Sequence, residues 1–278
     1  MIDTIQKWLA KIAFKLFKHR LRKLANCYFY ENRSPSPQNA IELFQGMWSS
    51  KFPNDIQVET QATAKAFEDK RIIWAIEQLG DLNGKVGLEL GPLEAGHSYM
   101  LQATGIKSLT SIESNSNSFL KCLIAKEVLG LNKVKFLFGD FVRYLKETSR
   151  NYDFIIASGV LYHLEKPVEF IESILEKGNR IYVWTHYYSK NLTSRFPQKF
   201  SKQKKVTYNK NTYLTSRYLY NNSLDWDGFC GGPNSYSTWL EKELIIKIFE
   251  DNGFKVEIHF DDIKHVHGPC ISFFAFKN

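Results

Sequence analysis

The chain has 278 residues, 44% of them hydrophobic, and a net charge of +8, which together allow a large core and exclude a disordered or fibrous protein. Its four cysteines show no paired spacing, so we expect reduced thiols in a cytoplasmic protein, without a disulfide framework or a metal site. No apolar run approaches the roughly 20 residues that a membrane-spanning helix requires.

The first predicted element is a helix over residues 4–24. Apolar residues recur at helical spacing from Ile2 to Leu16, opposite a stripe of lysines, and residues 1–25 hold seven basic residues against one acid. Such a helix either packs on the folded domain or makes peripheral contact with an anionic membrane surface. We assign residues 1–65 to a helical N-terminal cap, which also includes a short helix that begins at Pro37.

From residue 64 onward, apolar strands alternate with helices. After a helix over 64–79, strands are expected at 85–90, 108–112, 134–138, 153–157 and 180–185. The helices between them are expected at 96–104, 116–129, 141–147 and 167–176. A final helix over 238–252 precedes two adjacent strands at 254–260 and 270–276.

This order of elements predicts an α/β fold, a doubly wound, mostly parallel sheet of seven strands covered by helices on both faces. The last two strands follow one another without a helix, which predicts an antiparallel final pair. The sheet domain would span residues 66–278 and would carry an inserted element at 186–237.

The stretch from Lys85 to Asp140 carries the strongest functional signal. The first strand leads into a glycine-containing turn over Glu89–Gly96, the second strand ends at Glu113, and the third ends at Gly139–Phe141. A dinucleotide-binding turn requires G-x-G-x-x-G, and Glu94 stands where the third glycine belongs. Because a carboxylate beside a pyrophosphate is unfavourable, a nicotinamide oxidoreductase is not expected.

Acids at three strand ends suit a nucleoside cofactor with a cationic amino-acid end. We expect Glu89 to lie beside that cationic end and Glu113 to accept hydrogen bonds from both ribose hydroxyls. Asp140 would accept one from the adenine amino group, and Phe141 would lie on the ring face.

In these motifs the chain resembles the class I S-adenosylmethionine-dependent methyltransferases. The resemblance covers roughly residues 66–188 and departs from the family's E/D-x-G-x-G-x-G turn, because Leu93 replaces the middle glycine and Gly96 comes one residue late. It implies S-adenosyl-L-methionine as the cofactor. The binding residues that it implies are Glu89, Gly91, Pro92, Gly96, Glu113, Ser114, Gly139, Asp140, Phe141 and Ser158.

Candidate catalytic residues follow the fourth and fifth strands: Tyr162, His163 and His186. Ligands of open α/β sheets lie outside the carboxyl ends of the strands, so these residues should lie near the reacting centre. Either histidine could accept a proton from an acceptor hydroxyl or amine, or could be a buried structural residue. His265 and His267 could reach the same region, but no acidic ligand spacing accompanies the histidines.

The insertion at 186–237 is basic and rich in tyrosine. Residues 185–224 hold eight basic residues and no acid, and Tyr208–Tyr213 has the character of a hairpin. Such a surface could hold RNA or an acidic sugar, or could simply be solvated. We expect a methyltransferase that acts on a polar small molecule or glycan, which could be anionic.

Two alternatives remain open. The segment Gly159–His163, GVLYH, resembles a motif of the tRNA wobble-uridine carboxymethyl transferases, where a tyrosine matching Tyr162 helps to hold the extra carboxylate of carboxy-S-adenosylmethionine. RNA modification is therefore the second hypothesis. The third is a non-catalytic module that docks through residues 4–24, although such a module has no need of acids at three strand ends.

Overall fold

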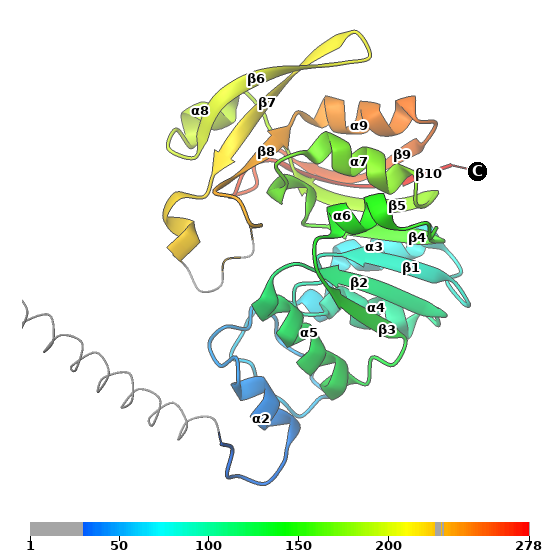
Figure 1. Cartoon of the computed structure of the whole chain (residues 1–278), viewed down its shortest axis with the longest axis vertical. Coiled ribbons are helices and arrows are strands. Elements are labelled where there is room, and N and C mark those ends of the chain that lie inside the picture. Colours follow the sequence, from blue (N-terminus) through cyan, green and yellow to red (C-terminus); the bar gives the residue numbers. More distant parts are fainter. Residues whose placement is uncertain (1–29, 226–228, 230, 278) are drawn as a thin grey trace, which may run out of the picture.

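The computed structural model describes residues 30–225, 229 and 231–277 (Figure 1). The predicted helix over residues 4–24 lies outside this part of the chain. No helix within the described part is both long and apolar enough to cross a membrane.

A seven-stranded sheet forms the centre of the molecule and confirms the predicted fold class. Five neighbouring strands are parallel, and the last strand of the chain runs antiparallel to the strands on either side of it. The spatial order is β3 (Val134–Phe138), β2 (Ser108–Glu113), β1 (Val86–Leu90), β4 (Phe154–Ser158), β5 (Arg180–His186), β10 (Cys270–Phe276) and β9 (Lys255–Asp262).

Helices cover both faces of this sheet (Figure 1). One face packs against α3 (Lys70–Leu79), α4 (Gly96–Ala103) and α5 (Ser116–Leu129). The other packs against α6 (Phe141–Glu147), α7 (Pro167–Leu175) and α9 (Lys242–Asp251). Successive residues of β4 alternate between the two cores, as the strand period of two requires: Ile155 belongs to the second layer and Ile156 to the first.

Two predicted helices differ from the structure. The segment 64–79 is interrupted at Asp69, which is extended and accepts a hydrogen bond from the Arg71 backbone N–H, so that a 3₁₀ turn, η1 (Ala66–Glu68), precedes α3. The predicted helix over 238–252 is wrong at its start. Residues 238–240 instead belong to β8 (Tyr236–Leu240), which pairs with a strand of the insertion. Strand pairing therefore overrides the local helical pattern at this point.

The insertion folds as a small antiparallel sheet. It consists of α8 (Asn191–Arg195), β6 (Phe200–Tyr208), β7 (Asn211–Leu219) and a 3₁₀ turn, η3 (Asn221–Asp225), before β8. The predicted hairpin at 208–213 is confirmed. Its two turn residues, Asn209 and Lys210, both have positive φ, the geometry of the tight turns that match strand twist.

The segment before α3 packs against α5. It contains α2 (Pro37–Glu42), and Trp48, Phe52 and Phe67 pack edge-on or tilted in series. The Trp48 indole N–H donates to the Ile41 carbonyl over 2.8 Å, which satisfies the polar atom of this buried ring. Lys121 on α5 donates to the Met47 carbonyl over 2.9 Å and so joins the chain between α2 and α3 to that helix.

Candidate functional site

A cavity of about 1280 Å³ opens at the carboxyl ends of β1, β2, β3 and β4. Small-molecule sites usually measure roughly 300–1,000 Å³, so this volume can hold two ligands together. The turns after these strands form its floor. Its walls are completed by residues 49–50, 64–66 and 68–71 of the N-terminal segment and by residues 232–234 of the insertion.

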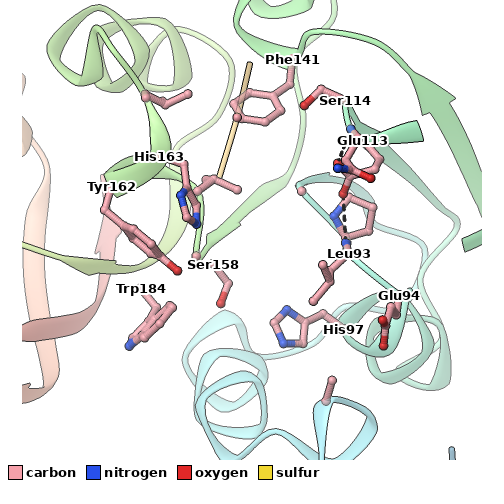
Figure 2. A pocket seen from close by; sticks show the side chains of 18 of the residues that line it. Leu93, Glu94, His97, Glu113, Ser114, Phe141, Ser158, Tyr162, His163 and Trp184 are labelled. Atoms are coloured by element: carbon pink, nitrogen blue, oxygen red, sulfur yellow. Dashed lines mark hydrogen bonds between the residues drawn. The ribbon is translucent and has the colours of Figure 1, made fainter. Parts of the chain in front are cut away.

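The predicted cofactor-binding residues converge on this cavity, with one difference. Those that line it are Gly91, Pro92, Gly96, Glu113, Ser114, Gly139, Asp140, Phe141 and Ser158, while Glu89 does not. Figure 2 shows Glu113, Ser114 and Leu93 on one side and Tyr162, His163 and Trp184 on the other, with His97 between the two groups.

Glu89 is placed differently from the prediction. Its side chain is 1% exposed, and its Oε2 accepts hydrogen bonds from the hydroxyls of Ser98 and, over 2.7 Å, Ser111. Burial raises the pKa of this carboxyl. Glu89 therefore joins β1 to β2 and α4 behind the cavity wall, while its Oε1 is buried without a hydrogen-bond partner.

The turn after β1 contains three residues in the left-handed conformation at alternate positions. Positions 91, 93 and 95 correspond to the three glycines of E-x-G-x-G-x-G, and here they are Gly91, Leu93 and Ala95. All three have positive φ, at 69°, 54° and 65°. A residue with a side chain is strained in this region, and such strain concentrates at functional sites.

Glu113 holds this turn in place. Its Oε2 accepts from the Leu93 backbone N–H over 3.1 Å, and its Oε1 accepts from the Asn115 N–H over 2.8 Å (Figure 2). Each carboxylate oxygen can accept a second hydrogen bond, so the group can still receive two hydroxyl donors from the cavity. Burial raises the pKa of Glu113, although the backbone N–H groups oppose this shift.

Asp140 and Phe141 lie at the end of β3. Asp140 accepts from the Val142 N–H over 2.8 Å and thereby caps α6, and its exposed side chain borders the cavity. Phe141 is buried against Phe170, with ring centroids 5.7 Å apart, and presents its remaining surface to the cavity. The pair can offer an acceptor and an apolar surface to an aromatic base.

Sequence reasoning missed a charged group that lines the cavity: Asp69, Arg71 and His97. Asp69 Oδ2 lies 3.0 Å from His97 Nε2 and 2.6 Å from Arg71 Nη2. Burial alone would raise the pKa of Asp69, but hydrogen bonds from His97 and Arg71 outweigh it and hold the pKa well below its usual value. The Arg71 guanidinium also lies 4.2 Å from the centroid of the Trp184 ring.

Tyr162 and His163 lie in a 3₁₀ turn, η2 (Leu161–His163), and both line the cavity. The Tyr220 hydroxyl donates to the Gly231 carbonyl, so it receives its 3.0 Å hydrogen bond from His163 Nδ1–H. This tautomer leaves His163 Nε2 with a lone pair. Burial, together with neighbouring His186, lowers the pKa of His163 to about 3, so the ring is neutral at physiological pH.

His186 does not line the cavity. Its Nδ1 donates to the carbonyls of Gly268, over 2.9 Å, and Pro269, and its ring stacks on Trp239 with centroids 5.2 Å apart. Burial lowers its pKa to about 4, although the two carbonyls act in the opposite direction. The expectation that His186 faces the reacting centre does not fit this position.

No family model matches the sequence, and no curated protein matches it. Solved structures do match. The N-terminal domain of EvdMO1, crystallised in the presence of SAH and D-fucose, has a TM-score of 0.62 at 18% identity, over 87% of this chain and 95% of that one. Magnesium protoporphyrin IX methyltransferase (ChlM) from Synechocystis PCC 6803, with bound SAH, has a TM-score of 0.52 at 15% identity, over 96% and 99%.

A third structure agrees with these two. N-methyltransferase NodS from Bradyrhizobium japonicum WM9, in complex with S-adenosyl-L-homocysteine (SAH), has a TM-score of 0.51 at 13% identity, over 87% of this chain and 99% of that one. The chain has the class I methyltransferase fold. The strand order and the antiparallel last strand of this methyltransferase fold are those described above, and the cavity lies at the edge of the sheet where open α/β folds bind ligands.

Proposed function

We propose that the chain is an S-adenosyl-L-methionine-dependent methyltransferase that acts on a polar small molecule or glycan. One observation carries the proposal. The turn over Gly91–Gly96, the Glu113 carboxylate and the Asp140–Phe141 pair all meet in one cavity, beneath a neutral histidine. These groups suit the amino-acid end, the ribose and the adenine of that cofactor in turn.

The cofactor would supply the activated methyl group, and the protein would position the acceptor. Glu113 would accept hydrogen bonds from the ribose hydroxyls, and Phe141 would pack on the adenine ring. His163 Nε2 is the group that can take a proton from an acceptor hydroxyl or amine. This nitrogen carries its lone pair at physiological pH, although the lowered pKa makes it a weaker base than an exposed imidazole.

The opposite wall supports a sugar-like acceptor. Trp184 offers an aromatic face, while Asp69, Arg71 and His97 offer both donors and acceptors within the same cavity. An aromatic surface beside convergent polar groups suits a ring that has hydroxyls at its edge and C–H groups on its face. The similar EvdMO1 domain was crystallised in the presence of D-fucose, which supports the same class of acceptor.

RNA modification is the second candidate because basic residues of the insertion lie beside the cavity. Lys204 and Arg217 line a small pocket together with Glu165 and Lys166, and the last two residues also line the main cavity. An anionic group of an acceptor could bind there. Replacing Lys204 and Lys205 by Glu should raise the acceptor KM and leave cofactor affinity unchanged, and equal loss of both would contradict a substrate role.

The test has two parts. Calorimetry should show one site for S-adenosylmethionine and for S-adenosylhomocysteine, and binding of neither would favour the non-catalytic module. Mass spectrometry of labelled methyl transfer into fractionated small molecules, glycans and RNA would then identify the acceptor. Methylation of RNA alone would overturn the assignment of a small-molecule or glycan acceptor.

A further inference from the structure

Three potential metal ligands meet behind the cavity wall, although they are far apart in the sequence. One ligand atom each from His186, His265 and Cys270 lies within 4.8 Å of the other two. Within the described part of the chain, this is the one group of three or more such side chains with this spacing. The sequence indicated no metal site because no motif spacing joins these residues, and the fold supplies the proximity.

The sheet places two of these ligands side by side. Cys270 on β10 is the direct antiparallel partner of His186 on β5, so their side chains project from the same face. His265 comes from the loop between β9 and β10, and its ring centroid lies 5.1 Å from that of His186. Cys270 and His186 are buried and His265 is half-buried, so the group is shielded without being closed to solvent.

The surroundings of His186 match those of a metal-binding histidine. Such histidines usually donate their second ring N–H to a carbonyl or carboxylate, which fixes the tautomer and the ring orientation. His186 Nδ1 donates to two backbone carbonyls of the β9–β10 loop, Gly268 over 2.9 Å and Pro269 over 3.2 Å. Its Nε2 therefore carries the lone pair that a metal ion requires.

Cys270 is a free cysteine, and the residue is only 1% exposed. Its thiol is therefore not tied up in a disulfide and is shielded from bulk solvent. Coordination would replace the S–H bond by a metal–sulfur bond and release one proton to solvent.

We propose that His186, His265 and Cys270 bind a single Zn²⁺ ion. Two imidazoles and one thiolate form a ligand set that zinc prefers, with a fourth tetrahedral position open to water. Zinc bonds of about 2.0–2.3 Å bring ligand atoms to roughly 3.5 Å from one another, so the group must contract slightly. His265 can supply this movement, because its Nδ1 accepts only a long hydrogen bond, 3.3 Å, from the His267 backbone N–H.

The ion would fasten the β9–β10 loop to the end of β5. Trp184 lies two residues before His186 and lines the cavity, so the same ion would fix one wall of the acceptor site from behind. The proposal does not depend on the identity of the acceptor or on methyl transfer, because metal binding can be measured on the resting protein.

Metal binding by the full-length protein provides the test. After removal of metal by a chelator, Zn²⁺ is titrated in competition with a chromophoric chelator, and Co²⁺ is added as a spectroscopic probe. We expect one equivalent to bind, with a thiolate charge-transfer band and the visible bands of tetrahedral Co²⁺. Cys270→Ser should remove the charge-transfer band, and both Cys270→Ser and His265→Gln should weaken Zn²⁺ binding by at least about 100-fold.

Cys122→Ser is the matched control, because Cys122 is also buried but lies on α5 away from the cluster. This variant should bind Zn²⁺ like the wild type. His265 lies in a half-buried loop, so its variant should fold even if Cys270→Ser does not, which circular dichroism would establish. Absence of one-equivalent binding by the wild type, or equal binding by the wild type and His265→Gln, would overturn the proposal.

Discussion

Lys121 Nζ on α5 lies 2.5 Å from Glu94 Oε1 in the turn after β1, and both side chains are buried. The same carboxylate accepts from the backbone N–H groups of Ser49 and Ser50, and Lys121 also donates to the Met47 carbonyl over 2.9 Å. This ion pair therefore joins the N-terminal segment to the cofactor turn. Since Lys121 compensates the charge of Glu94, this carboxylate would repel a pyrophosphate less than the sequence predicted, and the glycine spacing is what disfavours a dinucleotide.

Breaking this pair should destabilise the protein strongly. Lys121→Met leaves a buried carboxylate without its cation, which typically costs about 3–5 kcal/mol. Chemical denaturation should show that loss in the free energy of unfolding. The double variant Lys121→Met/Glu94→Gln should recover part of it, and a loss below about 1 kcal/mol in the single variant would contradict a structural role for the pair.

Glu113→Ala should weaken cofactor binding. Loss of a charged hydrogen-bond acceptor costs about 1.5–3 kcal/mol, or roughly 10-fold or more in the dissociation constant. Calorimetry with S-adenosylhomocysteine measures this change without a methyl acceptor. Glu127→Gln, at an exposed position on α5, is the control and should bind normally. Unchanged affinity in Glu113→Ala would remove this residue from the cofactor site.

Gly91→Ala should disturb the turn in two ways. The residue has a φ of 69°, and an added Cβ would lie 2.5 Å from Val160 Cγ1. Gly130→Ala separates the two effects, because Gly130 has a similar φ of 62° with no atom within 4 Å of its Cβ position. Gly130→Ala should cost about 1–2 kcal/mol of stability from backbone strain alone. Gly91→Ala should cost more and should also lower cofactor affinity, and equal costs would show that Val160 yields easily.

His163→Gln should lower kcat while leaving the cofactor dissociation constant unchanged. Removal of a general base typically reduces the rate by about 10²–10⁴-fold. Turnover at saturating cofactor and acceptor is the relevant measurement. A His259→Gln variant, which removes a half-buried histidine of β9 that does not line the cavity, should retain far more of the activity. Equal turnover of His163→Gln and the wild type would mean that the reaction needs no proton acceptor at this position.

Acid should destabilise the protein through its buried histidines. The pKa of His163 falls to about 3 and that of His186 to about 4, against an ordinary 6.5. Between these values the unfolded chain binds more protons than the folded one, so stability is lost as the pH falls below about 6.5. Urea denaturation between pH 8 and pH 4 should show this loss, and the His163→Gln variant should show less of it. A free energy of unfolding that is equally sensitive to pH in both proteins would contradict the assignment.

Local signals predicted much of the fold. The helix over 116–129 has the predicted bounds, because Asn115 caps its start through the Ser118 N–H and Gly130 ends it in the left-handed conformation. The strands of the sheet are apolar and bounded by turns, so their bounds differ from the predictions by two residues or fewer. β8 was not predicted because its structure depends on pairing with β7, and the sequence of β8 alone does not indicate that pairing.

The sequence predicted those site residues whose place in the cavity is set by the ends of the parallel strands. Glu113 ends β2 and Asp140 follows β3, and both reach the cavity because parallel strands end at one edge of the sheet. Glu89 lies behind the cavity wall because strand alternation directs its side chain towards Ser98 on α4. The contact between Asp69 and His97 had no local signal, since it depends on how η1 packs against α4.

The turn after β1 shows that a backbone conformation can be kept where the usual residue types are absent from the sequence. Leu93 and Ala95 adopt backbone angles that glycine usually supplies, and Glu113 accepts the Leu93 N–H that this path presents. A sequence motif that requires glycine at each position would not match this segment, whereas a structural motif defined by backbone torsion angles would match it. In this chain the left-handed conformation therefore recurs at positions 91, 93 and 95, although only the first of them is glycine.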